Sequence, residues 1–444
     1  METSKSSSNP YVYDKPVTGD KFFGRENEIQ QIEKALNETK GGIVILGQHR
    51  IGKTSLLFEL NNRLDVNQFV TIHFDFLTLG GSPAEIWSGM AKQIARQPMM
   101  NPSVSEDKNS QQRIPTPPPT FFDDEGIRFQ REFLQEVYNV LPSPSQRLIL
   151  LIEYFDVVLS SLGFENQRNP VLQALIRISN EERRTVIIFA GMRESGKWEV
   201  EFRDLLTQGQ VFNLSVLNRE SATRLITSLS ENIRYGPSAI ERIFALTNGH
   251  PYFTQLLCSK VFDAARASST ADVLSVPQTL VDSVVPDVLR EGETVFERMW
   301  ESVSSHERPV MSALTELMIK EEPSLIFDRL HSRKQDIPFD QLTTLLKNLV
   351  EMQLLEEVRG NFGFLIPLFG LWVKERKPLQ QTIEESKAQE SAQQKEERNE
   401  ILVNFALNDR PVGEDKLGYD DYAKAFAQVL ANPDTKTPLK RDWG

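Results

Sequence analysis

Eight consecutive residues near the start of the chain have the types and spacing that phosphate binding requires. They match the pattern G-x-x-x-x-G-K-[ST] and are Gly47, Gln48, His49, Arg50, Ile51, Gly52, Lys53 and Thr54. In such a loop the glycines let backbone N–H groups point at phosphate oxygens, the lysine adds positive charge, and the hydroxyl can ligate Mg²⁺. The sequence therefore predicts that Lys53 faces the β- and γ-phosphates of a nucleotide and that Thr54 binds Mg²⁺.

The segments on either side of this loop are the elements that must position it. "GIVILG" is a short, apolar, β-branched run bounded by glycines, which is typical of a buried parallel strand. After the loop, leucines from Leu56 to Leu64 recur at helical spacing, and the N-terminus of that helix adds partial positive charge. "FVTIHFDFL" predicts the next strand, so this order indicates a parallel α/β sheet. Ser55, next to the loop, is included among the predicted nucleotide contacts.

A loop of this kind hydrolyses nucleotide only if acidic side chains stand at a neighbouring strand end. The candidate strand is "LILLIEYFDVV", with Glu153 as a second Mg²⁺ ligand and Asp156 as another catalytic candidate. Tyr154 occupies the position where a second acid is usual, and a phenol with a pKa of about 10 is a poor general base near neutral pH. We therefore expect firm binding and slow hydrolysis. Arg193, at the tip of "VIIFAGMRES", is the candidate γ-phosphate sensor, with an ordinary surface arginine as the alternative.

Length and composition limit the class of protein. A chain of 444 residues predicts two or three domains. The single cysteine, Cys258, cannot form an internal disulfide, which fits a reducing cytoplasm. We expect a cytoplasmic protein without a membrane partner, because neither a secretory signal nor a bilayer-spanning run is present. The formal net charge of −12 also argues against a nucleic acid partner.

The patterns divide the chain into a P-loop core with a parallel sheet, followed by an α-helical lid domain and a winged-helix domain. The lid is predicted from helical spacing, and the winged helix from helices that end in two short strands, "LLEEVR" and "FGFLIP". The expected boundaries are 1–20 for a flexible arm, 21–216 for the nucleotide-binding domain with a disordered insertion at 98–125, 217–292 for the lid, 293–378 for the winged helix, 379–404 for a charged helix or linker, and 405–444 for a C-terminal segment.

Five segments, in this order, resemble the STAND class of P-loop NTPases, near its archaeal-ATPase and AAA-like branch. The resemblance spans about residues 21–376 and rests on "FFGRENEIQQIEKAL", "GQHRIGKTSLL", "LIEYFDVV", "VIIFAGMRES" and "LTNGHPYFTQLLC". It implies a signalling switch that binds ATP and Mg²⁺, changes conformation, and self-associates or binds a partner protein. It also implies that Arg25 lies near the base or phosphates, and that a lid motif touches the nucleotide through Gly249, His250 and Pro251.

Two other functions stay open: a working ATPase of the AAA-like class, and a DNA-associated regulator that uses the winged helix. For the lid motif, the alternative is an ordinary corner between helices, because glycine and proline commonly form such corners. Near the C-terminus, "KLGYDDYAKAFAQVLANPDTKTPL" resembles the start of a KAP-type P-loop NTPase. We expect it to be either the remnant of a lost effector domain or a docking peptide.

Overall fold

The computed structural model divides into two units, Met1–Ser386 and Lys387–Gly444, and the elements below belong to the first. Arg193 and the segment that resembles a KAP-type NTPase lie outside the described residues. The structure describes residues 8–38, 42–96, 116–156, 169–192, 209–229, 231–269, 271–317, 320–389 and 391–392.

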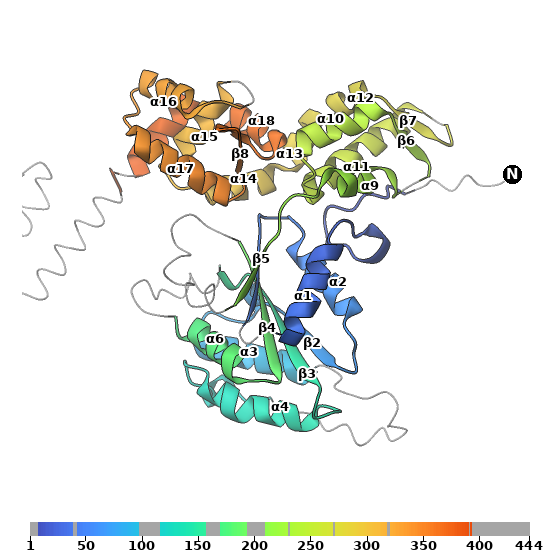
Figure 1. Ribbon diagram of the computed structural model, residues 1–444, viewed down its shortest axis with the longest axis vertical. Helices are drawn as coiled ribbons and strands as arrows, with labels where there is room; N and C mark the ends of the chain where they lie inside the picture. Colours follow the sequence, from blue (N-terminus) through green and yellow to red (C-terminus); the bar gives the residue numbers. More distant parts are fainter. Residues whose placement is uncertain are drawn as a thin grey trace, which may run out of the picture. The chain divides into compact units, whose positions relative to one another are not determined.

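A five-stranded sheet holds the phosphate loop at its carboxyl edge (Figure 1). The strand order is β2-β3-β4-β1-β5, and every neighbouring pair is parallel. In register, Glu153 at the end of β3 lies opposite Asp75 and Ala190, so the strand ends form one edge. The strands are β1 (Ile43–Leu46), β2 (Phe69–Asp75), β3 (Arg147–Glu153), β4 (Thr185–Gly191) and β5 (Gln210–Asn213).

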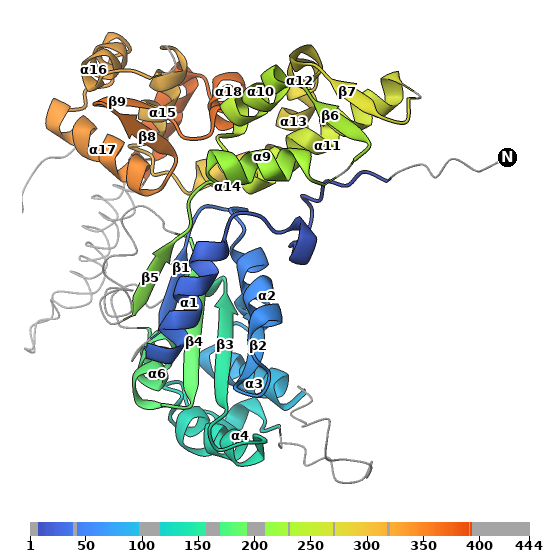
Figure 2. The ribbon, with the colours of Figure 1, turned by 45° about the vertical axis from the view of Figure 1, so that its right-hand side comes forward.

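Helices cover both faces of this sheet (Figure 2). On β1, Ile43 and Ile45 pack with α1 and α2, whereas Val44 and Leu46 belong to the cluster on the opposite face. Burial of both faces explains why the strands read as continuous apolar runs. The helices are α1 (Glu26–Glu38) and α2 (Lys53–Arg63) on one face, and α3 (Pro83–Arg96), the π-helical turn η4 (Phe129–Phe133), α4 (Leu134–Val140) and α6 (Pro170–Glu181) on the other.

Part of the expected disordered insertion is ordered. Within 98–125, residues 116–125 include the short helix η3 (Pro119–Phe121). Phe122 is 6% exposed and packs with Phe129 and Phe133, so the expectation of disorder is wrong here. Aromatic burial outweighs the proline-rich composition on which that expectation rested.

A second apolar core joins the lid and the winged helix. The lid also contains a short parallel strand pair, β6 and β7, which was not predicted from the sequence. Its elements are α9 (Arg219–Thr227), β6 (Ile233–Tyr235), α10 (Pro237–Thr247), α11 (Pro251–Ser268), β7 (Leu274–Val276), α12 (Gln278–Ser283) and α13 (Val285–Glu291).

The winged helix contains an antiparallel hairpin, β8 with β9, which turns at Arg359 and Gly360 with positive φ at both residues. Its elements are α14 (Glu293–Glu301), α15 (Arg308–Thr315), α16 (Pro323–Ser332), α17 (Phe339–Glu351), β8 (Leu355–Val358), β9 (Asn361–Phe364) and α18 (Pro367–Arg376). Over the described part of the chain, no helix is both long and apolar enough to cross a bilayer.

The chain on either side of these domains is also packed. Residues 1–20 were expected to form a flexible or wrapping arm. In the described part, residues 8–20, Tyr11 is only 5% exposed and sits in the lid core, which fits a wrapping arm. Beyond the winged helix, residues 379–386 are helical. One face of that helix is buried at helical spacing, through Leu379, Thr382, Ile383 and Ser386.

Candidate functional site

The phosphate loop has the backbone shape that an anion site needs. Gly52 caps α2 with φ +101°, and Arg50 also has a positive φ of 61°. A Cβ on Gly47 would lie 2.8 Å from the Ile51 side chain and 3.1 Å from the carbonyl of Leu214, so the loop requires glycine there. The curl places the N-terminus of α2, with its exposed backbone donors, where phosphate groups can bind.

Lys53 is held inside this curl by the loop itself. Its Nζ donates to the carbonyl oxygens of Gly47 at 2.9 Å and Gln48 at 2.8 Å. Burial lowers the pKa of Lys53 to about 8, against the opposing effect of the Asp156 and Glu153 carboxylates. The ammonium is therefore still protonated at neutral pH, and a phosphate could replace the carbonyls as its partner.

The two predicted Mg²⁺ ligands meet, and a third residue joins them. The Thr54 hydroxyl donates to Oε1 of Glu153, and Oε2 of Glu153 lies 2.5 Å from Nε2 of His73. His73 on β2 also packs edge-on against Phe58, with 5.1 Å between ring centroids. A hydroxyl and a carboxylate fit Mg²⁺, which often takes few protein ligands and completes its shell with phosphates and water. His73 was missed; the only signal was a polar residue inside an apolar strand.

Two further residues shape the end of β3. Asp156 is 4% exposed, and its Oδ2 accepts a hydrogen bond of 2.7 Å from the backbone N–H of Met192. This bond ties β3 to the chain that leaves β4 towards Arg193. Tyr154 adopts φ +57°, a left-handed conformation that is unusual for an aromatic residue and is often found at functional sites.

Arg25 braces the loop through its backbone. It is 4% exposed, and its guanidinium donates to the carbonyls of Ile51 at 3.3 Å and Ser215 at 2.5 Å, and to Glu28 at 3.0 Å. Burial lowers the pKa of Arg25, which the Glu28 carboxylate opposes. These contacts tie the domain entry to the phosphate loop and to the chain after β5.

The lid motif brings a buried histidine to the phosphate loop. Gly249 has φ +73°, and a Cβ there would lie 2.3 Å from the carbonyl of Leu217, while Pro251 begins α11. His250 is fully buried, and its ring lies 4.9 Å from that of Phe253. Burial, with the charges of Arg25, His49 and Lys53, lowers the pKa of His250 to about 3.

This depressed pKa predicts that acid destabilises the fold through His250. In the unfolded state His250 takes up a proton as the pH falls below about 6.5, the ordinary pKa of histidine. In the folded state it does so only near pH 3. The free energy of unfolding is therefore highest above pH 6.5 and decreases as the pH falls. Between pH 7 and pH 5 this loss is about 2 kcal/mol for His250. Urea unfolding should show that His250→Leu lowers the pH dependence by about this amount.

The exposed His331→Leu variant is the matched control and should keep the wild-type pH profile. Equal profiles for wild type and His250→Leu would mean that the folded protein can protonate this ring.

The winged helix contacts the same loop. The Gln48 side-chain amide donates to the carbonyl of Gln353, a residue with φ +61° in the turn between α17 and β8. A cavity of about 200 Å³ lies here and is lined by loop residues, Met192, and Arg298 of α14. The charge of Arg298 also helps to lower the pKa of His49 to about 3, after burial and Lys53. Sequence reasoning missed Arg298 and Gln353, because they follow the loop by hundreds of residues.

Comparison with known proteins identifies the fold. No family model matches the sequence, and no curated protein matches it. The Walker-type ATPase paby2304 of Pyrococcus abyssi has a TM-score of 0.59 at 17% identity, with 81% of this chain and 99% of that chain covered. The ORC2 protein of Aeropyrum pernix, in its ADPNP–ADP complexes, has a TM-score of 0.58 at 15% identity, with 86% and 98% covered.

At such identities the likeness concerns the fold alone. The expected fold class is confirmed: an α/β core with the P-loop NTPase fold and a parallel sheet, followed by a lid and a winged helix. The ORC1 protein of A. pernix in complex with DNA also resembles this chain, at 13% identity. Its TM-score of 0.40 is too low to carry an argument about nucleic acid here.

Proposed function

We propose that this chain is a STAND-type switch that binds ATP with Mg²⁺ and hydrolyses it slowly. Nucleotide state would control the conformation of the lid and winged helix, and thereby self-association or binding of a partner protein in the cytoplasm. The observation that carries the proposal is the convergence of Lys53, Thr54 and Glu153 on a loop that His250 and Gln353 also approach. A ligand shifts a conformational equilibrium only through contacts that differ between the states, and both neighbouring domains can supply them.

The roles of the site residues follow from their chemistry. The ammonium of Lys53 and the first backbone N–H groups of α2 would bind the phosphates, and Thr54 with Glu153 would hold Mg²⁺. When bound, Mg²⁺ would neutralise charge on the β- and γ-phosphates. His73 would keep the Glu153 carboxylate turned towards Thr54. The ADPNP–ADP complexes of the A. pernix protein support an adenine nucleotide as the ligand.

The remaining predicted contacts stay part of this proposal. His250 is the lid residue proposed to meet the nucleotide, with Gly249 and Pro251 fixing its backbone. Asp156 would position the end of β4, and Arg193 would follow it as a phosphate sensor. The other proposed contacts are Arg25 and the loop residues Gly47, Gln48, His49, Arg50, Ile51, Gly52 and Ser55.

A working ATPase is the second candidate. The Glu153–His73 pair favours it. The Glu153 carboxylate is held beside the Thr54 hydroxyl, so an acidic group for catalysis is present whatever residue stands at position 154. A DNA-associated regulator has less support, since Lys347 is the only basic residue of α17. DNA readers usually present a basic recognition face. A gel shift with competitor DNA separates this alternative from the other two.

Arg298→Ala tests whether the winged helix senses the nucleotide. Because Arg298 lines the cavity beside the loop, its cation can distinguish ATP from ADP by the additional negative charge. Calorimetry should show ATP binding weakened about tenfold, roughly 1.4 kcal/mol, with a smaller loss for ADP.

Arg333→Ala, on the same domain but outside the cavity lining, should bind both nucleotides like wild type. Equal affinities for ATP in wild type and Arg298→Ala would show that Arg298 does not sense the nucleotide.

A further inference from the structure

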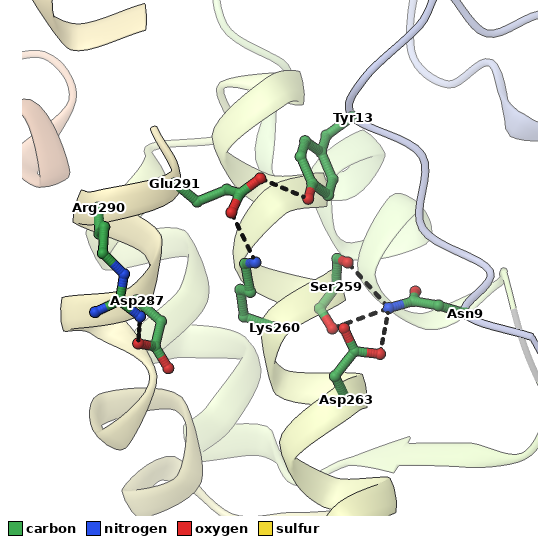
Figure 3. Close-up of polar contacts among 8 residues, drawn as sticks. All are labelled: Asn9, Tyr13, Ser259, Lys260, Asp263, Asp287, Arg290 and Glu291. Atoms are coloured by element: carbon green, nitrogen blue, oxygen red, sulfur yellow. Dashed lines mark hydrogen bonds and ion pairs between the residues drawn. The ribbon is translucent and has the colours of Figure 1, made fainter. Parts of the chain in front are cut away.

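The N-terminal segment is attached to the lid by specific hydrogen bonds (Figure 3). Nδ2 of Asn9 donates to the carbonyl and the hydroxyl of Ser259, both at 3.0 Å, and to Asp263 at 2.8 Å. The buried hydroxyl of Tyr11 donates to the carbonyl of Ile226 at 2.7 Å. Asn9 is therefore bound to α11 and Tyr11 to α9.

The next two residues extend the same attachment. The backbone N–H of Val12 donates to the side chain of Gln255, a buried residue of α11, at 2.8 Å. The hydroxyl of Tyr13 donates to Glu291 at 3.2 Å, and Glu291 also pairs with Lys260 at 3.1 Å (Figure 3). Four of the five residues 9–13 donate hydrogen bonds to the lid, and the ring of one of them, Tyr11, is buried, so this is a firm anchor.

The same segment then reaches the helix that follows the phosphate loop. The backbone N–H of Val17 donates to the hydroxyl of Ser55 at 3.1 Å, and that of Gly19 donates to Glu59 at 2.8 Å. Ser55 lies in the first turn of α2, directly after Thr54. One short stretch of chain therefore holds the lid at one end and the phosphate-loop helix at the other.

The connection between these anchors is short. Only Asp14, Lys15 and Pro16 separate Tyr13 from Val17, and all three are exposed. Four extended residue steps reach at most about 14 Å. While both anchors are bound, the lid can therefore move away from α2 only until the residues between Tyr13 and Val17 are fully extended.

We propose that residues 9–19 form a strap that limits separation of the lid from the phosphate-loop helix and that releases at its α2 end. The lid anchor combines a buried tyrosine with several side-chain hydrogen bonds, whereas the α2 anchor rests on two backbone N–H groups. Release at Val17 would free the lid while the strap stays on it. The proposal goes beyond nucleotide binding, and its test uses the protein alone.

Hydrogen exchange of the full-length protein without nucleotide tests the strap. The lid-end variant Asn9→Ala with Tyr11→Phe removes polar contacts only and should raise exchange of the Val17 and Gly19 amides at least tenfold. Ser55→Ala should raise exchange at the same two amides while residues 11–13 stay protected. Arg333→Ala, whose side chain pairs with Glu316 on the winged helix, is the matched control and should change neither.

Unchanged exchange at Val17 and Gly19 in the lid-end variant would show that the two anchors are independent and would overturn the strap. Loss of protection at residues 11–13 in Ser55→Ala would overturn release at the α2 end. ATP titration of the same proteins is a separate readout. If wild type fails to bind ATP, the proposed function fails, while the exchange data still decide the strap.

Discussion

Lys53→Ala is expected to weaken binding of Mg²⁺·ATP at least tenfold, or about 1.4 kcal/mol and more. The ammonium is already oriented by two loop carbonyls, at 2.9 and 2.8 Å, at the point where the loop curls around the phosphate position. Its removal deletes the ammonium that the loop orients and that is proposed to pair with the β- and γ-phosphates. Calorimetric titration of wild type and variant measures the loss directly.

Lys347→Ala, an exposed lysine on α17, controls for a general change in charge and should bind like wild type. The fold of Lys53→Ala should be intact, because burial already disfavours the ammonium in the folded state. Equal ATP affinity in wild type and Lys53→Ala would reject the loop as the nucleotide site.

Tyr154→Glu is expected to raise the turnover of ATP tenfold or more. Burial, with the Glu153 and Asp75 carboxylates, raises the pKa of Tyr154, so the phenol stays protonated and cannot accept a proton from water. A carboxylate at 154 could do so, and general bases contribute on the order of 10² to 10⁴ in rate. Steady-state phosphate release gives kcat for both proteins.

Tyr154→Phe removes only the hydroxyl and should leave the slow rate unchanged. A wild-type turnover near the enzyme median of about 10 s⁻¹, or its loss in Tyr154→Phe, would favour the working ATPase over the switch.

The phosphate loop and the sheet could be predicted because their signals are local. Glycine positions, a β-branched run such as Ile43–Leu46 and helical leucine spacing each specify structure within a few residues. The sequence also predicted that Thr54 and Glu153 lie close together, because parallel strands present their carboxyl ends at one edge of the sheet. His73 was missed because its partner is fixed by the register of β2 against β3, which no local pattern reveals.

Longer-range features could not be predicted from local patterns. Gln353 contacts Gln48 only because the winged helix turns back onto the loop, 305 residues away in sequence. The polar composition of residues 1–20 predicted a flexible or wrapping arm but did not reveal where it packs: Tyr11 is buried in the lid core. Arg25 donates to oxygen acceptors on α1, in the phosphate loop and after β5, and no local pattern reveals such a set of partners.

The central claim is that this loop holds an adenine nucleotide with Mg²⁺ and retains it for longer than a fast enzyme would. The most direct measurement incubates the purified full-length protein with ATP and Mg²⁺, removes free nucleotide by gel filtration, and identifies what the denatured protein releases. We predict about one adenine nucleotide per chain, mostly as ATP, and none from Lys53→Ala treated in the same way. Absence of adenine nucleotide from wild type, or equal amounts from Lys53→Ala, would contradict the account.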